Sequence, residues 1–427
     1  MQSRNLPKVT PMEARNFHTV EELSQILVTP LYKITNLLDS ERRSNYQKRV
    51  RVVTPGAKKV RWTYKSLGSL AGIQAKVDKV LAPLYSEMEY EKHVIGYRTG
   101  LHLKDELEKL KGFDCIIQID IKGYYDYITL TNIKEALVGY GFNQAGAKLL
   151  GRLNLVWNGK VNSLQQGSHA SPTIANLVGH HVWDKPILNW LNSAEAEGGF
   201  KSFAPEDTTA KFRYVRYSDN LLIAFSFADI EKSRAFKEAY IKKVHACCKA
   251  HKFIAKPADV VPQNHPHRAQ KFLGAIINHQ VRIDTEKFQS YRALLFNWVC
   301  KPPEVFFQKI VTHNPKSFAI LNSTNSMHHI YNRQLVLAAL LQEVKGFTNY
   351  VGNINKVQYR QLKNLLYALD TFPSDKYSIH VSTTIDTKWF NALKQYKLPI
   401  QEYKDICDSL NTEVTFDPID LIEPSSL

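Results

Sequence analysis

The sequence predicts an α+β fold, because it contains separate segments typical of strands and of helices. Residues 113–121 (FDCIIQIDI) form a nearly continuous apolar run, which is typical of a buried strand. Residues 211–226 contain two β-rich runs around Asp219 and Asn220, which indicates a hairpin with a tight polar turn. The chain has 427 residues and is too long for one small core, so we expect two or three subdomains.

The segments before the first strand read as helix, hairpin and helix. Residues 18–38 carry an interrupted helical pattern that opens with Thr19 and Glu22, a candidate capping box. Residues 48–63 (KRVRVVTPGAKKVRWT) alternate valines with basic residues around a Pro-Gly turn, so they predict a basic β-hairpin. Residues 70–90 then predict a helix.

Further elements follow between and after the strands. Residues 131–157 predict two short helices, and 171–193 predict a longer helix that is strained by an internal proline. We expect a loop at 194–211. Beyond the hairpin, the expected elements are a helix at 230–251, strands near 252–262 and 271–284, helices over 285–400 and a solvated acidic tail at 401–427.

Composition narrows the class of protein. Hydrophobic residues make up 44% of the chain, enough to bury sizeable cores. No run approaches the roughly 18 apolar residues of a membrane span, and the N-terminus lacks a signal-peptide core, so we expect no membrane partner and a cytoplasmic protein. Five irregularly spaced cysteines indicate free thiols. Lys and Arg number 56 against 40 Asp and Glu, a net charge of +16, which favours a nucleic-acid partner.

Two carboxylates occupy matching places in the sequence. Asp120 is the next-to-last residue of the apolar run 113–121, and Asp219 follows the first half of the hairpin. If the two strand ends are neighbours, the carboxylates can hold a pair of Mg²⁺ ions for phosphoryl transfer. The alternative is that each aspartate caps a turn.

A third stretch points to a ligand. LQQGSHASPTIANL (164–177) is a Gly- and Ser-rich turn that runs straight into a helix. Small residues permit close approach of the backbone to a base pair or sugar. We therefore expect Gln166, Gly167 and Asn176 near a bound molecule.

Taken in order, these stretches resemble a known family. DIKGYYDYI (120–128), QGSHASPTIAN (166–176) and RYSDN (216–220) resemble the palm motifs of reverse transcriptases, with the closest likeness to the bacterial retron and group II intron branch. Each motif alone is weak, but the ordered set is highly specific.

The likeness extends on both sides, over about residues 45–365. The basic hairpin and HVIGYRTG (93–100) resemble segments of the fingers. KFLGAIIN (271–278) resembles the strand that grips the primer, and GFTNYVGNIN (346–355) resembles the thumb of retron-type enzymes.

The resemblance implies a right-hand polymerase. Its palm would be a ferredoxin-like antiparallel sheet with helices behind it. The implied division is an N-terminal extension and fingers at 1–112, a palm at 113–284 with fingers helices at about 131–165, a helical thumb and C-terminal region at 285–400, and the tail at 401–427.

The resemblance also implies the roles of single residues. Asp120 and Asp219, with the backbone of Ile121, would bind two Mg²⁺ ions, or Mn²⁺ in their place. Tyr125 would lie beneath the sugar as an aromatic gate that rejects a ribose 2′-hydroxyl and so selects dNTPs. The other implied nucleotide-binding residues are Gln166, Gly167, Lys59, Arg61 and Lys256. The implied primer grip is Phe272, Leu273 and Gly274.

The sequence departs from the family at Asn220, where relatives carry a second aspartate. An amide oxygen can still ligate Mg²⁺, since hard cations accept neutral oxygens. We expect weaker metal binding and slower chemistry, with Asn220 retained at the catalytic centre.

Other polar residues near the motifs could be taken for metal ligands, but we interpret them as structural. Asp126 lies six residues past Asp120 and is expected to cap the following helix. His169, His180 and His181 lack a further ligand at suitable spacing.

The favoured function is an RNA-directed DNA polymerase that adds dNTPs to a 3′ end. No endonuclease, RNase H-like or zinc pattern is evident. The resemblance therefore favours a free-standing bacterial enzyme that acts with a dedicated noncoding RNA in antiphage defence. Its partners would be an RNA template, a DNA primer or product, and dNTPs, and both a homo-oligomer and a hetero-oligomer are compatible with the sequence. The alternatives are an RNA-dependent RNA polymerase and a non-catalytic RNA-binding relative.

Overall fold

The structure of the chain is a computed structural model in which two compact units can be distinguished. It describes residues 15–52, 61–88, 91–98, 100–157, 160–204, 208–300, 341 and 344–371. The first unit draws its residues from 1–49, 63–101 and 112–270, and the second from 50–62, 102–111 and 271–427. Lys59 and the expected acidic tail at 401–427 lie outside the described residues.

A four-stranded antiparallel sheet forms the centre of the first unit. Its strands are β3 (Cys115–Asp120), β6 (Lys211–Tyr217), β7 (Asn220–Ser226) and β8 (Asp259–Pro262), in the order β6-β7-β3-β8. The strand expected at 113–121 and the hairpin expected at 211–226 are thus confirmed. The α+β class is confirmed with them, because helices and an antiparallel sheet share one unit.

One face of the sheet belongs to the hydrophobic core. Successive residues of a strand point to opposite faces, so every second apolar residue of β3 and β7 lies on the same side. These core residues are Ile117, Ile119, Leu221, Ile223 and Phe225. Helices α9 (Ser171–Gly179), α10 (Lys185–Asn192) and α12 (Ile230–Ala250) contribute to the same core.

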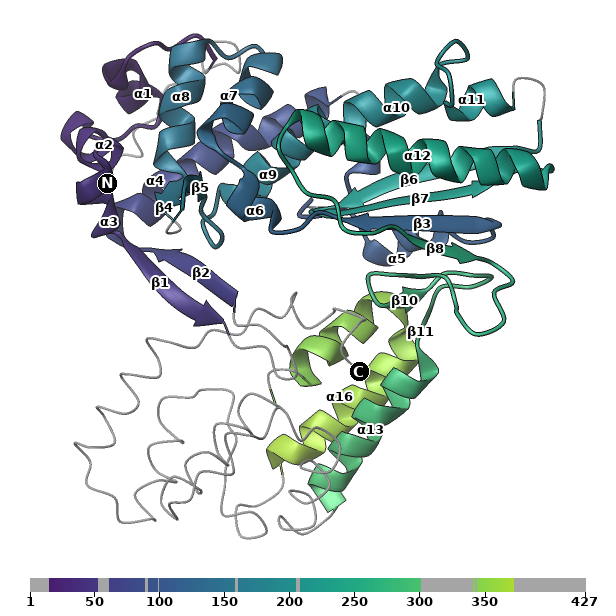
Figure 1. The fold of residues 1–427 in the computed structure, drawn as a ribbon. Coiled ribbons are helices and arrows are strands. Elements are labelled where there is room, and N and C mark those ends of the chain that lie inside the picture. The colour runs from purple at the N-terminus through teal and green to yellow at the C-terminus, as the bar shows by residue number, and fades with distance from the viewer. Residues whose placement is uncertain are drawn as a thin grey trace. The chain divides into compact units, whose positions relative to one another are not determined.

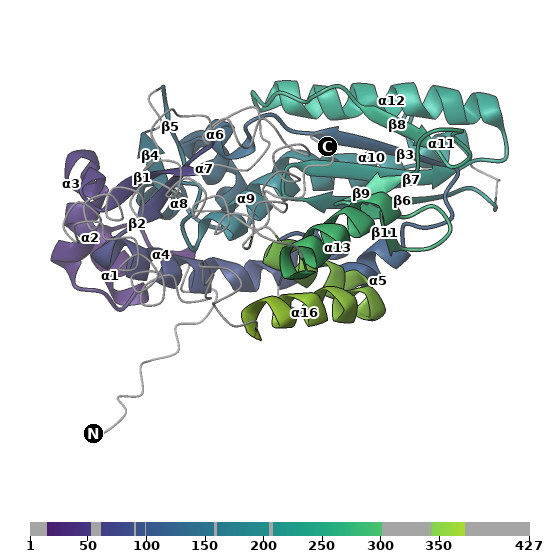
Figure 2. The same cartoon turned by 90° about the horizontal axis from the view of Figure 1, so that it is seen from below.

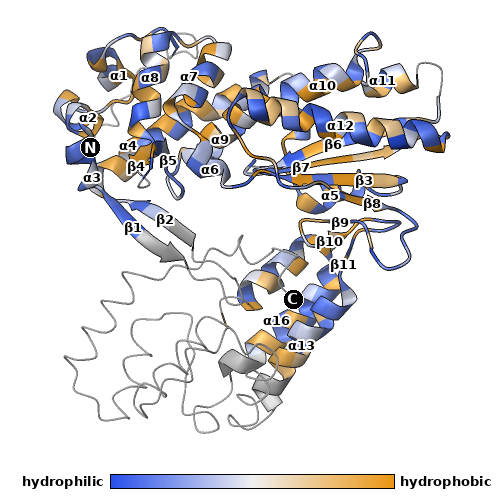
Figure 3. Ribbon diagram, viewed as in Figure 1, coloured by the Kyte–Doolittle hydropathy of each residue, from blue (hydrophilic) through white to orange (hydrophobic). Residues whose placement is uncertain are grey.

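Helix α12 runs lengthwise along the strands (Figures 1 and 2). It begins at Asp229, whose carboxylate accepts backbone N–H bonds of the first turn, as expected for an N-cap. Its Phe236 is fully buried, with the ring centroid 4.9 Å from that of Phe225. Figure 3 shows the contrast between the hydrophobic strands β3 and β7 and the more polar α12. The helix expected at 230–251 is confirmed.

The opposite face of β3 and β7 is polar at one end. Gln118 and Asp120 alternate with the core residues of β3, and Asn220 is the partner of Asp120 in the ladder. A shift of one residue would exchange the two faces. Burial of the isoleucines and leucines therefore fixes where these polar side chains lie.

The N-terminal part of the first unit is mostly helical, with two differences from expectation. The helix expected at 18–38 is divided into α1 (Val20–Ile26) and α2 (Leu31–Leu38), because Pro30 interrupts it. The helix expected at 70–90 is α4 (Gly68–Leu81) followed by a 3-10 segment over Ala82–Glu87. The capping box of Thr19 and Glu22 is confirmed.

Several short elements lie between Ser40 and Phe203. They are α3 (Ser40–Ser44), β1 (Gln47–Val52), β2 (Arg61–Ser66), a 3-10 turn (Glu91–His93), α6 (Tyr124–Tyr127), α7 (Leu130–Gly139), α8 (Gln144–Leu153), β4 (Leu155–Trp157), β5 (Asn162–Leu164) and α11 (Phe200–Phe203). The β1–β2 pairing and the helices α7 and α8 confirm the expected hairpin and the two short helices. The segment at 194–211 is not all loop, since α11 lies within it.

The long helix expected at 171–193 contains a π-helical turn. Between α9 and α10, His180–Asp184 form a π-helix in which the N–H of Lys185 donates to the carbonyl of His180. Pro186 follows at once and has no N–H to donate. The wider turn brings the Asp184 side chain into the core, where it is fully buried.

The described part of the second unit contains α5 (Leu103–Glu108), three short strands and two long helices. The strands are β9 (Lys271–Phe272), β10 (Ala275–Ile276) and β11 (Arg282–Ile283), in the order β11-β10-β9. Helices α13 (Thr285–Cys300) and α16 (Lys356–Thr371) follow. The ring of Phe347, within the expected thumb motif, stacks on Tyr291 of α13 at 4.0 Å.

Removing the Phe236 ring tests the packing of α12 against the sheet. Phe236→Ala leaves a cavity among aromatic side chains, so we expect the free energy of unfolding to fall by about 3–5 kcal/mol. Urea denaturation followed by circular dichroism measures the change. Glu238→Ala, on the exposed side of the same helix, is the control and should stay close to the parent. Equal stability of the two variants would contradict this packing.

Candidate functional site

The β6–β7 hairpin carries its two turn residues, Ser218 and Asp219, at one end of the sheet. Tyr217 pairs with Asn220 across the turn. Ser218 has a φ of +54°, a left-handed conformation that is uncommon outside glycine. The turn is therefore held by surrounding contacts, and Asp219 at its tip is half-buried.

The two carboxylates predicted from sequence come together at this turn. Asp120 lies directly opposite Asn220 in the β3–β7 ladder. The backbone N–H of Ile121 donates to the carbonyl oxygen of Asp219 at 2.9 Å. Residues 99 positions apart in sequence thus become neighbours through strand register.

Lys256 joins this pair. Its Nζ lies 2.7 Å from Oδ1 of Asp120, and its backbone N–H donates to the Asp120 carbonyl at 2.8 Å. The Lys256 side chain is 49% exposed and that of Asp120 is 26% exposed, so solvent partly screens the ion pair.

Asn220 is hydrogen-bonded on both sides of its amide. Its Oδ1 accepts from Nε2 of Gln118 at 3.2 Å, and its Nδ2 donates to Oδ1 of Asp219 at 3.4 Å. In this arrangement the amide acts as a donor toward Asp219. Because an amide oxygen has two lone pairs, Oδ1 can accept from Gln118 and still offer one lone pair to a metal.

Tyr125 is a half-buried residue of the short helix α6. Burial raises the pKa of its hydroxyl well above the ordinary value, with Tyr97 and the Asp219 charge adding to the effect. The hydroxyl therefore stays protonated. The ring lies at 5.7 Å from that of Tyr124, which is itself fully packed in the core.

The Gly- and Ser-rich loop is joined to strand β2. The carbonyl of Gln166 accepts from the N–H of Tyr64 at 2.9 Å. Gly167 has a φ of +105°, and a Cβ there would lie 3.0 Å from the Tyr64 carbonyl oxygen. Gln166 is half-buried and Gly167 is exposed. Both lie beside Tyr64 in β2, the second strand of the basic hairpin. Arg61 is the first residue of β2.

Gln165, which the sequence did not single out, makes the firmest contacts of this loop. It is fully buried. Its Nε2 donates to the Tyr64 carbonyl at 2.8 Å and to Oγ of Ser66 at 2.6 Å, and its Oε1 accepts from Gln47 at 2.7 Å. The only feature of the sequence that points to Gln165 is the pair of glutamines before Gly167.

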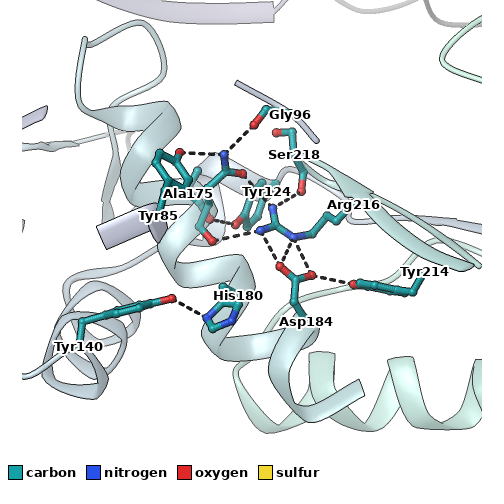
Figure 4. A network of polar contacts seen from close by, with 11 residues as sticks. Tyr85, Gly96, Tyr124, Tyr140, Ala175, His180, Asp184, Tyr214, Arg216 and Ser218 are labelled. Carbon is teal, nitrogen blue, oxygen red and sulfur yellow. Dashed lines mark hydrogen bonds and ion pairs between the residues drawn. The ribbon is translucent and has the colours of Figure 1, made fainter. Parts of the chain in front are cut away.

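A buried ion pair lies behind the turn (Figure 4). Arg216 of β6 and Asp184 of the π turn are both fully buried. Nε of Arg216 lies 2.9 Å from each oxygen of the Asp184 carboxylate, and Nη2 lies 2.8 Å from Oδ2. Burial alone would lower the pKa of Arg216, but the Asp184 carboxylate outweighs it and raises that pKa above its ordinary value.

The same guanidinium reaches the Ser218–Asp219 turn and helix α9. Its Nη1 donates to the Ser218 carbonyl at 3.0 Å and to Oδ1 of Asn176 at 3.1 Å. Asn176 also donates through Nδ2 to the Gly96 carbonyl at 2.8 Å. The expectation that Asn176 faces a ligand is therefore wrong, because its side chain is fully buried and occupied by protein partners. Gly179 is needed here, since a Cβ would lie 2.6 Å from the guanidinium carbon.

Two further interpretations from sequence have different outcomes. Asp126 does not cap the following helix: it lies inside α6, and Thr129 is the N-cap of α7. The expectation failed because the chain makes an extra helical turn, α6, between β3 and α7. His180 is structural as expected, since its Nδ1 is hydrogen-bonded to the Tyr140 hydroxyl.

The residues expected to grip the primer form a tight hairpin in the second unit. Leu273 and Gly274, with φ of +49° and +81°, make the turn between β9 and β10. Positive φ at both central positions is typical of a type I′ turn. Phe272 is buried.

A divalent ion fits the donors at the hairpin turn. Two carboxylates and neighbouring backbone oxygens are ligands that Mg²⁺ prefers, and such sites use one or two carboxylates with substrate phosphates. No group of three or more His, Cys, Asp or Glu side chains suited to a metal occurs within the described ranges. The donors present are two carboxylates, so the phosphates of a bound nucleotide would complete the coordination of a metal held here.

Comparison with known families identifies the chain. Residues 63–277 match the family described as reverse transcriptase (RNA-dependent DNA polymerase). The match covers half of the sequence, includes both aspartates, and confirms the polymerase fold expected from the motifs. The chain belongs to the reverse transcriptase family and is a nucleotidyltransferase.

Solved structures give weaker likenesses. A telomerase from Candida albicans in complex with a TWJ fragment of telomeric RNA has a TM-score of 0.37 and 10% identity, over 84% of this chain and 69% of that chain. An apo telomerase from Candida tropicalis has a TM-score of 0.36 and 13% identity, over 85% and 70%. The Sicinivirus 3Dpol RNA-dependent RNA polymerase has a TM-score of 0.32 and 12% identity, over 61% and 59%. Comparison with curated proteins gives no match.

Breaking the buried ion pair should strongly destabilise the first unit. Asp184→Leu leaves a buried guanidinium without its carboxylate, so we expect a loss of about 3–5 kcal/mol in the free energy of unfolding. In the double variant Asp184→Leu/Arg216→Met both charges are replaced by apolar groups, and much of that loss should be regained. Denaturant titrations of both variants and the parent measure this. A double variant no more stable than the single one would contradict the explanation by an uncompensated charge.

Proposed function

We propose that this member of the reverse transcriptase family adds dNTPs to the 3′ end of a primer on an RNA template, with Asp120, Asp219 and Asn220 at the catalytic centre. The observation that carries the proposal is the pairing of Asp120 with Asn220, which brings the two aspartates to the same end of the sheet. The charge of +16 supports a nucleic-acid substrate.

Asp120 and Asp219, with the backbone of Ile121, would hold two Mg²⁺ ions, or Mn²⁺ in their place. When bound, the ions neutralise the charge that develops on the attacking and leaving oxygens of the phosphoryl transfer. The protein's own part is to fix the two carboxylates before substrate arrives. Strand register and the bond from Ile121 to Asp219 provide this support.

Lys256 has a role in two states. In the free enzyme its ammonium offsets the charge of Asp120, at 2.7 Å. Once the Asp120 carboxylate takes another partner, the exposed Lys256 side chain can rotate toward the triphosphate. A cation there favours departure of pyrophosphate. Lys59, Arg61, Gln166 and Gly167 would contact the nucleotide or template, and Phe272, Leu273 and Gly274 the primer.

Tyr125 would select the sugar. A half-buried ring next to the Asp219 turn can exclude a ribose 2′-hydroxyl, and its burial keeps the hydroxyl neutral. This favours dNTPs over NTPs and distinguishes the proposal from an RNA-dependent RNA polymerase.

The biological setting is proposed from the motifs. A retron or group II intron-like enzyme would act with a dedicated noncoding RNA in bacterial antiphage defence, in the cytoplasm, alone or as an oligomer. None of the helices in the described ranges is both long and apolar enough to cross a bilayer.

Incorporation of labelled nucleotides by the purified protein tests the proposal. We expect dNTP incorporation in Mg²⁺ or Mn²⁺, and a loss of at least about 100-fold in Asp120→Asn and Asp219→Asn, because each removes a charge that stabilises the transition state. Glu238→Ala, purified and assayed in the same way, is the control and should keep the parent rate. Incorporation of NTPs alone would indicate an RNA polymerase, and tight RNA binding without synthesis a binding protein.

Restoring the second carboxylate tests the place of Asn220. In Asn220→Asp, a third negative group faces Asp120 and Asp219, so we expect tighter metal binding. The Mg²⁺ concentration for half-maximal incorporation should fall by about tenfold, an electrostatic gain typical of closely placed charges. An unchanged or higher Mg²⁺ requirement would show that this position does not contribute to the metal site.

Replacing Lys256 tests its two roles. In Lys256→Met the ammonium is lost while the stem is kept, so Asp120 is freed for metal but the leaving group loses its cation. We expect a lower Mg²⁺ requirement together with a several-fold lower maximal rate. Titration of Mg²⁺ at saturating dNTP separates the effects. If both quantities stay at the parent values, Lys256 is only a surface residue.

A further inference from the structure

A short segment, residues 94–96, packs against the Ser218–Asp219 turn. Val94 forms an isolated parallel bridge with Arg216, and the N–H of Ile95 donates to the Arg216 carbonyl at 2.9 Å. All three residues of the segment are buried. The segment therefore continues the sheet beyond β6, along the edge of that strand that does not face β7.

Gly96 makes a close approach to the turn. A Cβ on this residue would lie 3.0 Å from the backbone nitrogen of Ser218 and 3.3 Å from both Cα and Cγ of Tyr217. Carbon atoms in contact are about 3.5–4.0 Å apart, so the two segments fit together because Gly96 has no side chain. Its backbone is not in the left-handed region. An alanine could therefore adopt the same conformation, and only lack of space excludes the methyl group.

Gly96 is also held in place on its other side. Its carbonyl accepts from Nδ2 of Asn176 at 2.8 Å. Oδ1 of Asn176 accepts from Nη1 of Arg216, which also donates to the Ser218 carbonyl at 3.0 Å. The contacts thus form a closed ring of four buried residues (Figure 4). Ser218, with its φ of +54°, is the strained member of this ring, so we expect a methyl group on Gly96 to displace the turn.

We propose that Gly96 is a positioning residue, whose bare backbone sets the place of the Asp219 carboxylate. Asp219 directly follows Ser218, so a displacement of Ser218 passes to it along the chain. Asp120 stays where strand register fixes it. The spacing of the two carboxylates would then change, and with it their fit to a metal. The inference rests on the proposed metal-binding role of Asp219.

Adding one methyl group tests the proposal. Gly96→Ala places a Cβ against the turn. Gly72→Ala, at an exposed position of α4, meets no atom within 4 Å and is the matched control. Titration with Mn²⁺ alone, followed by the electron paramagnetic resonance signal of the free ion, measures the affinity for the metal. We expect Gly96→Ala to weaken it by about tenfold, a loss typical of removing the support of a metal ligand.

Incorporation of dNTPs gives a second measurement on the same variants. At saturating Mn²⁺ the rate of Gly96→Ala should fall by about tenfold, because small misplacements of reacting groups are costly. Gly72→Ala should keep the parent rate.

Asp219→Asn separates this inference from the proposed function. It should weaken Mn²⁺ binding at least as much as Gly96→Ala does. If it does so while Gly96→Ala matches Gly72→Ala, the role of Gly96 is overturned and the metal site stands. If Asp219→Asn keeps the parent affinity, the metal site itself is wrong and the inference falls with it.

Urea denaturation of the same variants separates positioning from folding. A Gly96→Ala protein that is less stable but binds Mn²⁺ like the parent would show a packing role only, which overturns the proposal. If Gly96→Ala does not fold, Ser218→Gly is compared with Ser218→Gly/Gly96→Ala, because glycine adopts the left-handed conformation of the turn readily. The double variant should bind Mn²⁺ about tenfold more weakly than Ser218→Gly, and equal affinities would overturn the proposal.

Discussion

The buried pair of Arg216 and Asp184 is the interaction on which the geometry of the site depends. One guanidinium bonds the carboxylate of the π turn, the amide of Asn176 and the carbonyl of Ser218. Burying two charges is costly, and an apolar replacement is often as stable. The ion pair instead contributes direction: the guanidinium is a planar fork with fixed donors, so it fixes helix α9, strand β6 and the Ser218–Asp219 turn relative to one another.

Strand register supplies the second constraint, and it acts on the carboxylates directly. The apolar residues of β3 and β7 that face the core permit only one pairing of the two strands. That pairing places Asp120 beside the end of the hairpin. The ion pair then sets the turn itself, so the sheet fixes one aspartate and the buried network fixes the other.

The sequence predicted what depends on local pattern. The apolar run that contains Asp120 and the polar turn at Asp219 allowed a carboxylate pair beside the alternative of two turn caps, and the resemblance to reverse transcriptases favoured the pair. It did not predict contacts made between distant segments. Asp184 lies just before a proline in a helical pattern, and Arg216 in an alternating strand, so neither reads as a buried ion. Asp126 was misplaced because an unforeseen helical turn precedes α7.

The free site keeps two carboxylates together at a modest electrostatic cost, and Asn220 contributes to this. Asp120 is offset by the Lys256 ammonium, and Asp219 receives the amide of Asn220. With an aspartate at position 220, three negative groups would share one end of the sheet, and like charges this close repel. The amide therefore lowers the cost of folding the site without metal. At the proposed metal site the same amide would supply one negative charge fewer than an aspartate, so stability of the free enzyme and affinity for the metal would be in opposition at this residue.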